Sequence, residues 1–235
     1  MKQFLCSALL ILAIGWRCSA GSCETLTLAG YISLGTGGCT IGTNTLFGFQ
    51  VLSGASGAVP ISPAAITIVP SGGTLDPALS AITTLTASAG TLREALFTYK
   101  ISGNPYIRDS IALTNSSASG DGAVTDVQNF CAGGTFGSDG ITGCSGKAGS
   151  LLALSGVQNR DSAKLGPASL LNVTDDFTLD GGLSGAASGG KITDQFAAAP
   201  EPSGLLLTGM ALFFALSLKL RSSGASWLKK QGGKL

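Results

Sequence analysis

The chain has 235 residues, is rich in glycine (35 residues), contains no histidine and has a formal net charge of +1. Without histidine, Ser-His-Asp and Cys-His catalytic devices are excluded. The near-neutral total hides an uneven distribution, because residues 21–198 hold seven basic and twelve acidic residues, a net charge of −5. An acidic central region argues against nucleic acid and anionic membrane surfaces as its partners.

The first twenty residues have the three parts of a secretory signal peptide. Lys2 provides the positive start, Phe4–Trp16 the apolar core, and Cys18–Ala20 the small residues of a cleavage position. We expect residues 1–20 to be a signal peptide cleaved after Ala20. Two alternatives stay open: a lipoprotein modified at Cys23, and an N-terminal helix that is not cleaved.

Apolar and polar residues then alternate along the body of the chain, which is typical of strands with one buried face. The longest alternating runs are Thr25–Leu34, Glu94–Ile101 and Leu171–Asp180. Shorter strand candidates lie at residues 47–52, 65–69, 107–114, 122–130 and 151–157.

Clusters of Gly, Ser, Asn and Pro separate these candidates, for example at residues 35–38, 71–73 and 102–105. About eight short strands with such punctuation predict a mostly β fold, an antiparallel β-sandwich domain over residues 21–180. Residues 181–199 are rich in Gly, Ser and Ala and are interpreted as a terminal segment and linker, with one further short strand near Lys191–Phe196.

Four cysteines remain after the signal segment: Cys23, Cys39, Cys131 and Cys144. Four cysteines allow three connectivities. We favour Cys23–Cys39 and Cys131–Cys144, because each pair is close in sequence and lies in its own glycine-rich stretch. The lack of CxxC spacing and of histidine argues against zinc, and export favours disulfides. We therefore predict no bound metal and no cofactor.

Paired aspartates are the nearest approach to a catalytic motif. Asp175 and Asp176 could act as the two carboxylates of a glycosidase, but successive residues of a strand point to opposite faces. Together with Asp180 they could also bind Ca²⁺, although the spacing of an EF-hand loop is missing. We interpret them as a solvated acidic strand face, and we predict no catalytic residues and no enzyme activity.

The chain ends with an apolar stretch followed by basic residues. Gly204–Leu218 carries no charge, and as a helix it would rise about 22 Å, or about 27 Å with its flanking residues, against a bilayer core of about 30 Å. Basic residues follow it at Lys219, Arg221, Lys229, Lys230 and Lys234. This asymmetry predicts a single membrane-spanning helix with its tail in the cytoplasm. The alternative is a buried terminal helix of a globular domain.

Pro200, Glu201 and Pro202 stand directly before this stretch. The order of Pro-Glu-Pro, short apolar helix and basic cluster is similar to the PEP-CTERM sorting signal of Gram-negative bacteria, over residues 200–235. The resemblance implies processing near the motif by exosortase, a membrane-embedded enzyme. It also implies transient anchoring in the inner membrane, then a final location at the cell surface or outside the cell. The alternative is an ordinary single-pass anchor.

The body also resembles the small, cysteine-bearing, β-rich proteins that precede this signal. The matching stretches are Gly38-Cys39, Cys131–Gly134 and Cys144–Gly146. The resemblance implies an exported structural protein of the cell surface or extracellular matrix, associated with exopolysaccharide and biofilm. The alternative is a non-catalytic β-sandwich module that binds carbohydrate or another surface polymer. Both tryptophans, Trp16 and Trp227, lie outside the body, which disfavours a lectin that stacks sugars on indole rings.

Overall fold

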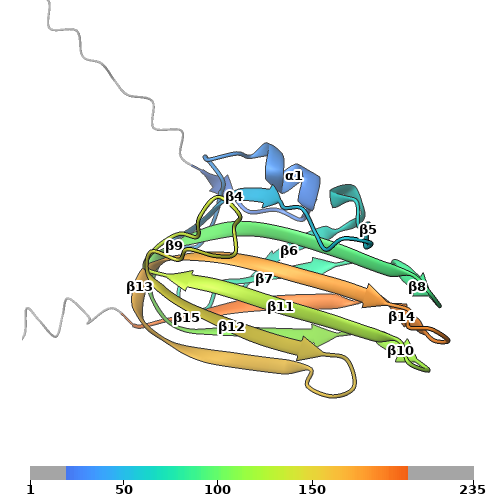
Figure 1. Cartoon of the computed structure of the whole chain (residues 1–235). Coiled ribbons are helices and arrows are strands. Elements are labelled where there is room, and N and C mark those ends of the chain that lie inside the picture. Colours follow the sequence, from blue (N-terminus) through green and yellow to red (C-terminus); the bar gives the residue numbers. More distant parts are fainter. Residues whose placement is uncertain (1–19, 201–235) are drawn as a thin grey trace, which may run out of the picture.

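A computed structural model describes residues 20–200 of the chain (Figure 1). Within this range no helix is long and apolar enough to cross a membrane. The predicted signal peptide and the predicted span at Gly204–Leu218 lie outside the described residues, except for Ala20.

Two long antiparallel strands organise the fold. Strand β9 (Leu92–Thr114) pairs with β13 (Arg160–Asp180) along nearly their whole lengths. Figure 1 shows β13 curving back at one end of the molecule, and the pairing slips there, between Lys164 and Leu170. Each long strand therefore contributes one half to each of two layers of a single curled sheet.

Layer A contains residues 92–102 of β9 and 170–180 of β13. The strands that join it are β1 (Gly21–Ser22), β3 (Cys39–Ile41), β4 (Asn44–Val51), β5 (Val59–Pro60), β11 (Ala123–Ala132) and β12 (Lys147–Leu154). Most pairs are antiparallel, but β1–β3 and β5–β9 are parallel.

Layer B contains residues 106–114 of β9 and 160–168 of β13. Its other strands are β15 (Lys191–Ala198), β7 (Ala78–Ile82), β6 (Thr67–Ser71) and β2 (Leu26–Thr27), paired in that order outward from β9. A separate small sheet at one tip of the molecule is formed by β8 (Thr86–Ser88), β14 (Ala186–Ser188) and β10 (Ser117–Ser119). Between residues 20 and 200 the helical elements are α1 (Leu28–Ser33) and the 3-10 turn η1 (Pro63–Ala65).

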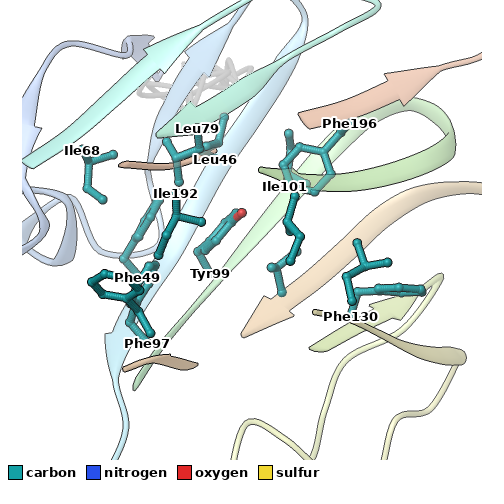
Figure 2. Close-up of a cluster of buried hydrophobic side chains, with 14 of the residues drawn as sticks. Leu46, Phe49, Ile68, Leu79, Phe97, Tyr99, Ile101, Phe130, Ile192 and Phe196 are labelled. Atoms are coloured by element: carbon teal, nitrogen blue, oxygen red, sulfur yellow. The ribbon is translucent and has the colours of Figure 1, made fainter. Parts of the chain in front are cut away.

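An aromatic cluster ties the two layers together (Figure 2). Tyr99 of layer A stacks on Phe49 with ring centroids 5.1 Å apart, and meets the edge of Phe196 from layer B at 6.4 Å. Phe196 also contacts Tyr106 at 6.0 Å. All four rings are buried. Burying a side chain such as Phe stabilises a fold by about 1.5–3 kcal/mol, so this cluster is a main contact between the layers.

The predicted mostly β fold is confirmed, but its two layers belong to one continuous curled sheet rather than to two separate sheets. The predicted apolar face of Glu94–Ile101 is buried, since Ala95, Phe97, Tyr99 and Ile101 are all buried. The residues between them do not form an exposed face, because Glu94, Leu96 and Thr98 are buried as well. The apolar face of Leu171–Asp180 is likewise buried.

The strand predicted at Thr25–Leu34 is wrong after its first residues. Thr27 caps a helix instead, since its hydroxyl accepts a hydrogen bond from the N–H of Gly30 at 3.1 Å. Leu28 and Tyr31, three residues apart, lie on the same side of this helix and are both buried. Leu28, Tyr31 and Ile32 are spaced three and four residues apart, which fits a helical period, whereas an alternating period places Tyr31 opposite the other two. Packing against the sheet selects the helix.

Two predicted boundaries also differ. The expected break at residues 102–105 is part of β9, because these residues form the bend between the layers rather than a turn. The expected linker at 181–199 contains β14 and β15, and β15 pairs with β9 on one side and β7 on the other. The short strand near Lys191–Phe196 is therefore confirmed as an internal strand. Its glycine-rich flank fits because a Cβ atom at Gly189 or Gly190 would lie within 3 Å of the backbone of Thr83 or Thr114.

Candidate functional site

A groove of about 610 Å³ runs along the outer face of layer B. Its floor is made by three neighbouring strands whose outward side chains alternate with the buried ones. Strand β9 contributes Arg108 and Ser110, β13 contributes Arg160, and β15 contributes Lys191 and Gln195. None of the residues lining this groove is aromatic.

The groove gathers positive charge within an acidic domain. Arg108, Arg160 and Lys191 line it, and Lys164 is the cross-strand partner of Arg108. These are four of the seven basic residues between positions 21 and 198. Asp161 also lines the groove, and its carboxylate accepts hydrogen bonds from the backbone N–H groups of residues 152 and 162.

The basic side chains are spaced along the strands. Arg160 pairs with Ala112, four residues beyond Arg108 on β9, a separation of about 13 Å along the strand. Hydroxyl and amide side chains, including Thr193 and Gln195, lie in the same groove. This arrangement offers two charged anchor points for an extended anion, with hydrogen-bonding groups beside them.

A second polar cluster lies inside the molecule. Asp126 of β11, Asp175 of β13 and Asp194 of β15 are all buried, and one carboxylate oxygen from each lies within 4.8 Å of those of the other two. Asp126 and Asp175 belong to layer A, and Asp194 belongs to layer B. We name these three residues the carboxylate cluster. It brings together strands that are remote in sequence and spans the core between the layers.

The carboxylate cluster has few hydrogen-bond partners. The hydroxyl of Tyr99 donates to Asp194 at 2.6 Å. The carboxylate oxygens of Asp126 and Asp175 receive no hydrogen bond of ordinary geometry in the described chain. The carboxyl groups of Asp175 and Asp194 lie close enough to share a proton. Gln128, the cross-strand neighbour of Asp175, is fully buried with both amide atoms unpaired. Buried polar atoms in proteins rarely lack a hydrogen-bond partner.

Burial controls the ionisation of these groups. It raises the pKa values of Asp109, Asp126 and Asp175 well above their usual range, and the charge of Asp194 adds to the shift in each. Burial raises the pKa of Asp194 to about 6, against the opposing effect of the Tyr99 hydroxyl. Several carboxylates cannot stay ionised together in such a place without a compensating positive charge.

The disulfide-bonded loop covers the outer face of β13. Cys131 is linked to Cys144, and within the loop Phe136 donates its N–H to the side chain of Asn172 at 3.1 Å. Thr174 donates to the carbonyl of Gly140 at 2.5 Å. The prediction that this face of the strand is solvated is therefore wrong. The loop that covers it shows no alternation of apolar and polar residues, so the sequence pattern did not reveal it.

The two adjacent aspartates point to opposite faces, as expected, but neither is fully solvated. Asp175 is buried in the core, and Asp176 is half-buried on the other face. Burial and the neighbouring Glu94 raise the pKa of Asp176 to about 6. Glu94 accepts a hydrogen bond from the N–H of Ala55 at 2.5 Å.

Both predicted disulfides, Cys23–Cys39 and Cys131–Cys144, are present. Of the predicted sorting motif, Pro200 is the last described residue, and Glu201 and Pro202 lie outside the described range, as do Lys219, Arg221, Lys229 and Lys230.

Sequence analysis did not single out Asp126, Asp194, Asp109 or the groove. A signal for the first two was present, because each aspartate occupies an inward position of a strand whose inward face also carries apolar residues. Asp126 follows Val124 by two residues, and Asp194 lies between Ile192 and Phe196. A charged residue in such a position marks a buried charge that needs a partner.

The sequence matches no protein-family model and no curated protein. Among solved structures, part of the Glycosylation Associate Protein (Gap123) complex from Streptococcus agalactiae is 13% identical with a TM-score of 0.27, covering 68% of this chain and 27% of that chain. TmCBM61, solved in complex with beta-1,4-galactotriose, is 9% identical with a TM-score of 0.26, covering 62% of this chain and 86% of its own.

The enzymatically active domain of tailspike protein 4 from Bacteriophage CBA120 is 14% identical with a TM-score of 0.26. It covers 69% of this chain and 21% of the tailspike chain. Similarities at this level establish no shared fold.

Proposed function

We propose that this chain is an exported, non-catalytic protein of the cell surface or extracellular matrix that binds an acidic polysaccharide along the groove of layer B. The observation that carries the proposal is the placement of four of seven basic residues on one sheet face of a domain with a net charge of −5. The two disulfides support an oxidising compartment outside the cytoplasm.

The chemistry of the groove favours anionic over neutral sugars. Guanidinium groups such as those of Arg108 and Arg160 form paired hydrogen bonds with carboxylates or sulfates. Hydroxyl and amide side chains beside them match sugar hydroxyls. Because the groove has no aromatic lining, charge rather than ring stacking provides the affinity, so binding weakens as salt increases.

The test is to measure binding of the exported protein to polygalacturonate and to neutral dextran at low salt. We expect binding to polygalacturonate only. Replacing both Arg108→Ala and Arg160→Ala should weaken it at least about tenfold, since each lost charge-assisted hydrogen bond contributes about 1.5–3 kcal/mol before screening. The matched control is Lys100→Ala with Lys147→Ala, which removes the same charge outside the groove. Equal binding by both variants, or a preference for dextran, would contradict the proposal.

We also infer that the protein is sorted through Pro200, Glu201 and Pro202, in the manner of an exosortase substrate. The position at which the folded domain ends supports this inference. Strand β15 ends at Ala198, and the N–H of Ala199 still donates to the carbonyl of Pro105 at 2.8 Å. The motif therefore follows the last sheet contact directly, and its prolines favour the extended backbone that a processing enzyme binds.

Intact-mass measurement of the surface and medium fractions tests the sorting. We expect a product without Arg221 and the lysine tail, and we expect Glu201→Ala to leave the full-length form in the membrane fraction. Glu24→Ala, an exposed glutamate elsewhere, is the control and should be processed normally. A surface product that retains Arg221, or normal processing of Glu201→Ala, would replace sorting with a plain single-pass anchor.

A further inference from the structure

The carboxylate cluster has the dimensions of a cation site. Calcium lies about 2.3–2.6 Å from its oxygen ligands, so ligands on opposite sides of one ion are about 4.8 Å apart. The oxygens of Asp126, Asp175 and Asp194 all lie within 4.8 Å of one another. A single ion between them could therefore contact all three without moving a strand.

A buried and unpaired amide side chain lies beside the carboxylate cluster. Gln128 is fully buried, and neither its amide oxygen nor its amide nitrogen has a partner among the described residues. It lies on the inward face of β11, two residues from Asp126 and directly across from Asp175. Cross-strand neighbours have Cβ atoms about 5 Å apart, so its amide oxygen is within reach of an ion held by the aspartates. An unpaired amide beside unpaired carboxylates is explained by a shared ligand.

The donor set selects the kind of cation. Every candidate ligand atom is a carboxylate or amide oxygen, and the cysteines of the described region are all in disulfides. Oxygen-only sites suit calcium and magnesium rather than zinc or copper. Magnesium retains several waters in octahedral geometry, whereas calcium accepts dense carboxylate coordination. A fully buried set of carboxylates therefore fits calcium better.

We propose that Asp126, Asp175 and Asp194, with the amide oxygen of Gln128, bind one calcium ion in the core and that this ion clamps layer A to layer B. Asp126, Gln128 and Asp175 come from layer A and Asp194 from layer B, so the ion would bridge the interface that the aromatic cluster also spans. The inference goes beyond polysaccharide binding and does not depend on it. It makes the stability of the exported domain depend on external calcium.

The experiment uses the full-length exported protein with both disulfides intact, stripped with EDTA and dialysed. Titration with CaCl₂ should show one saturable site. Its Kd should be at or below about 10⁻⁴–10⁻³ M, the range of extracellular calcium-binding modules. At about ten times the Kd, calcium should raise Tm by about 3–5 °C. MgCl₂ at the same concentration should produce a smaller shift.

Asp175→Asn and Asp126→Asn should abolish the calcium-dependent shift in Tm. In EDTA both variants should still unfold cooperatively, with Tm equal to or above that of the unsubstituted protein, because a neutral amide replaces a buried carboxyl. The matched control is Asp180→Asn, the same change at an exposed position of the same strand, which should keep the full calcium response.

Two results would overturn the site. One is the absence of saturable calcium binding together with identical Tm values in EDTA and in CaCl₂. The other is a calcium response retained in both Asp175→Asn and Asp126→Asn, which would place the ion elsewhere. If the groove variants lose polysaccharide binding but keep the calcium response, the proposed function and the calcium site are separately established.

Discussion

The two faces of strand β15 place charged side chains in opposite environments, one exposed to solvent and one buried. Lys191 and Gln195 face outward into the groove, whereas Asp194 between them faces inward among buried rings. The outer charge remains hydrated and is available for a ligand, so it costs the fold little. The inner charge has lost its water and must be neutralised by a proton or a cation. The same strand thus provides a binding surface on one side and a stability-controlling group on the other.

The largest expected effect on stability comes from a substitution on the buried face of β15. Phe196→Ala removes a fully buried ring that contacts Tyr99 and Tyr106, so it should lower the free energy of unfolding by about 3–5 kcal/mol. Denaturant unfolding provides the measurement. Leu183→Ala, at a side chain that is 90% exposed, is the outer control and should change stability by less than about 0.5 kcal/mol. Similar losses in both variants would contradict the assigned core.

A smaller effect is expected from the hydroxyl that supports the inner charge. Tyr99→Phe keeps the stacked ring but removes the hydrogen bond from the Tyr99 hydroxyl to the Oδ2 atom of Asp194, and should lower the free energy of unfolding by about 1–3 kcal/mol. Tyr31→Phe is the comparison, since its hydroxyl donates to the backbone carbonyl of Glu24 at a part-buried position. We expect it to cost less than Tyr99→Phe. Urea titrations of the two variants would show a reversed order if the inner hydroxyl were unimportant.

Asp176 is an intermediate case, half-buried on the outer side of layer A beside Glu94. Its folded pKa is raised to about 6, mainly by burial and then by Glu94, so the folded state binds its proton more tightly than the unfolded state. The resulting stability is present at low pH, and it is lost as pH rises through about 6.

The stability of Asp176→Asn relative to the unsubstituted protein should therefore increase as the pH is raised from 4 to 7. Thermal unfolding across this range, at fixed salt, measures the difference in Tm. Asp180→Asn, which changes an exposed carboxylate, serves as the control. A difference that stays constant with pH would show that Asp176 is not held protonated.

The smallest effect on stability is expected at the outer surface. Gln195→Lys adds a positive charge to the groove and should leave Tm unchanged, because the side chain is exposed. It should strengthen binding to polygalacturonate by about two- to fivefold, which corresponds to about 0.5–1 kcal/mol for an added surface charge pair. Parallel measurements at low and high salt sharpen the result, since the gain should disappear when charges are screened. A gain that survives high salt would indicate contacts other than charge.

Local sequence patterns were sufficient for features that depend on neighbours in the chain. The pairing of Cys23 with Cys39 and of Cys131 with Cys144 followed from short separations, and the structure contains both. The inward faces of Glu94–Ile101 and Leu171–Asp180 followed from alternation, which is a property of any pleated strand.

Only the tertiary structure decided what those faces meet. Asp175 was interpreted as part of a solvated acidic face, although its position in the alternation is that of Val173 and Phe177, which are buried. The sequence could not show that Asp126 and Asp194 converge on it, because strand pairing and layer packing bring them together. Nor could it show that a disulfide-bonded loop covers Asn172 and Thr174, or that residues 102–105 bend a strand rather than end it. A two-residue period records which side a residue faces, whereas the environment on that side depends on contacts between segments that are distant in the sequence.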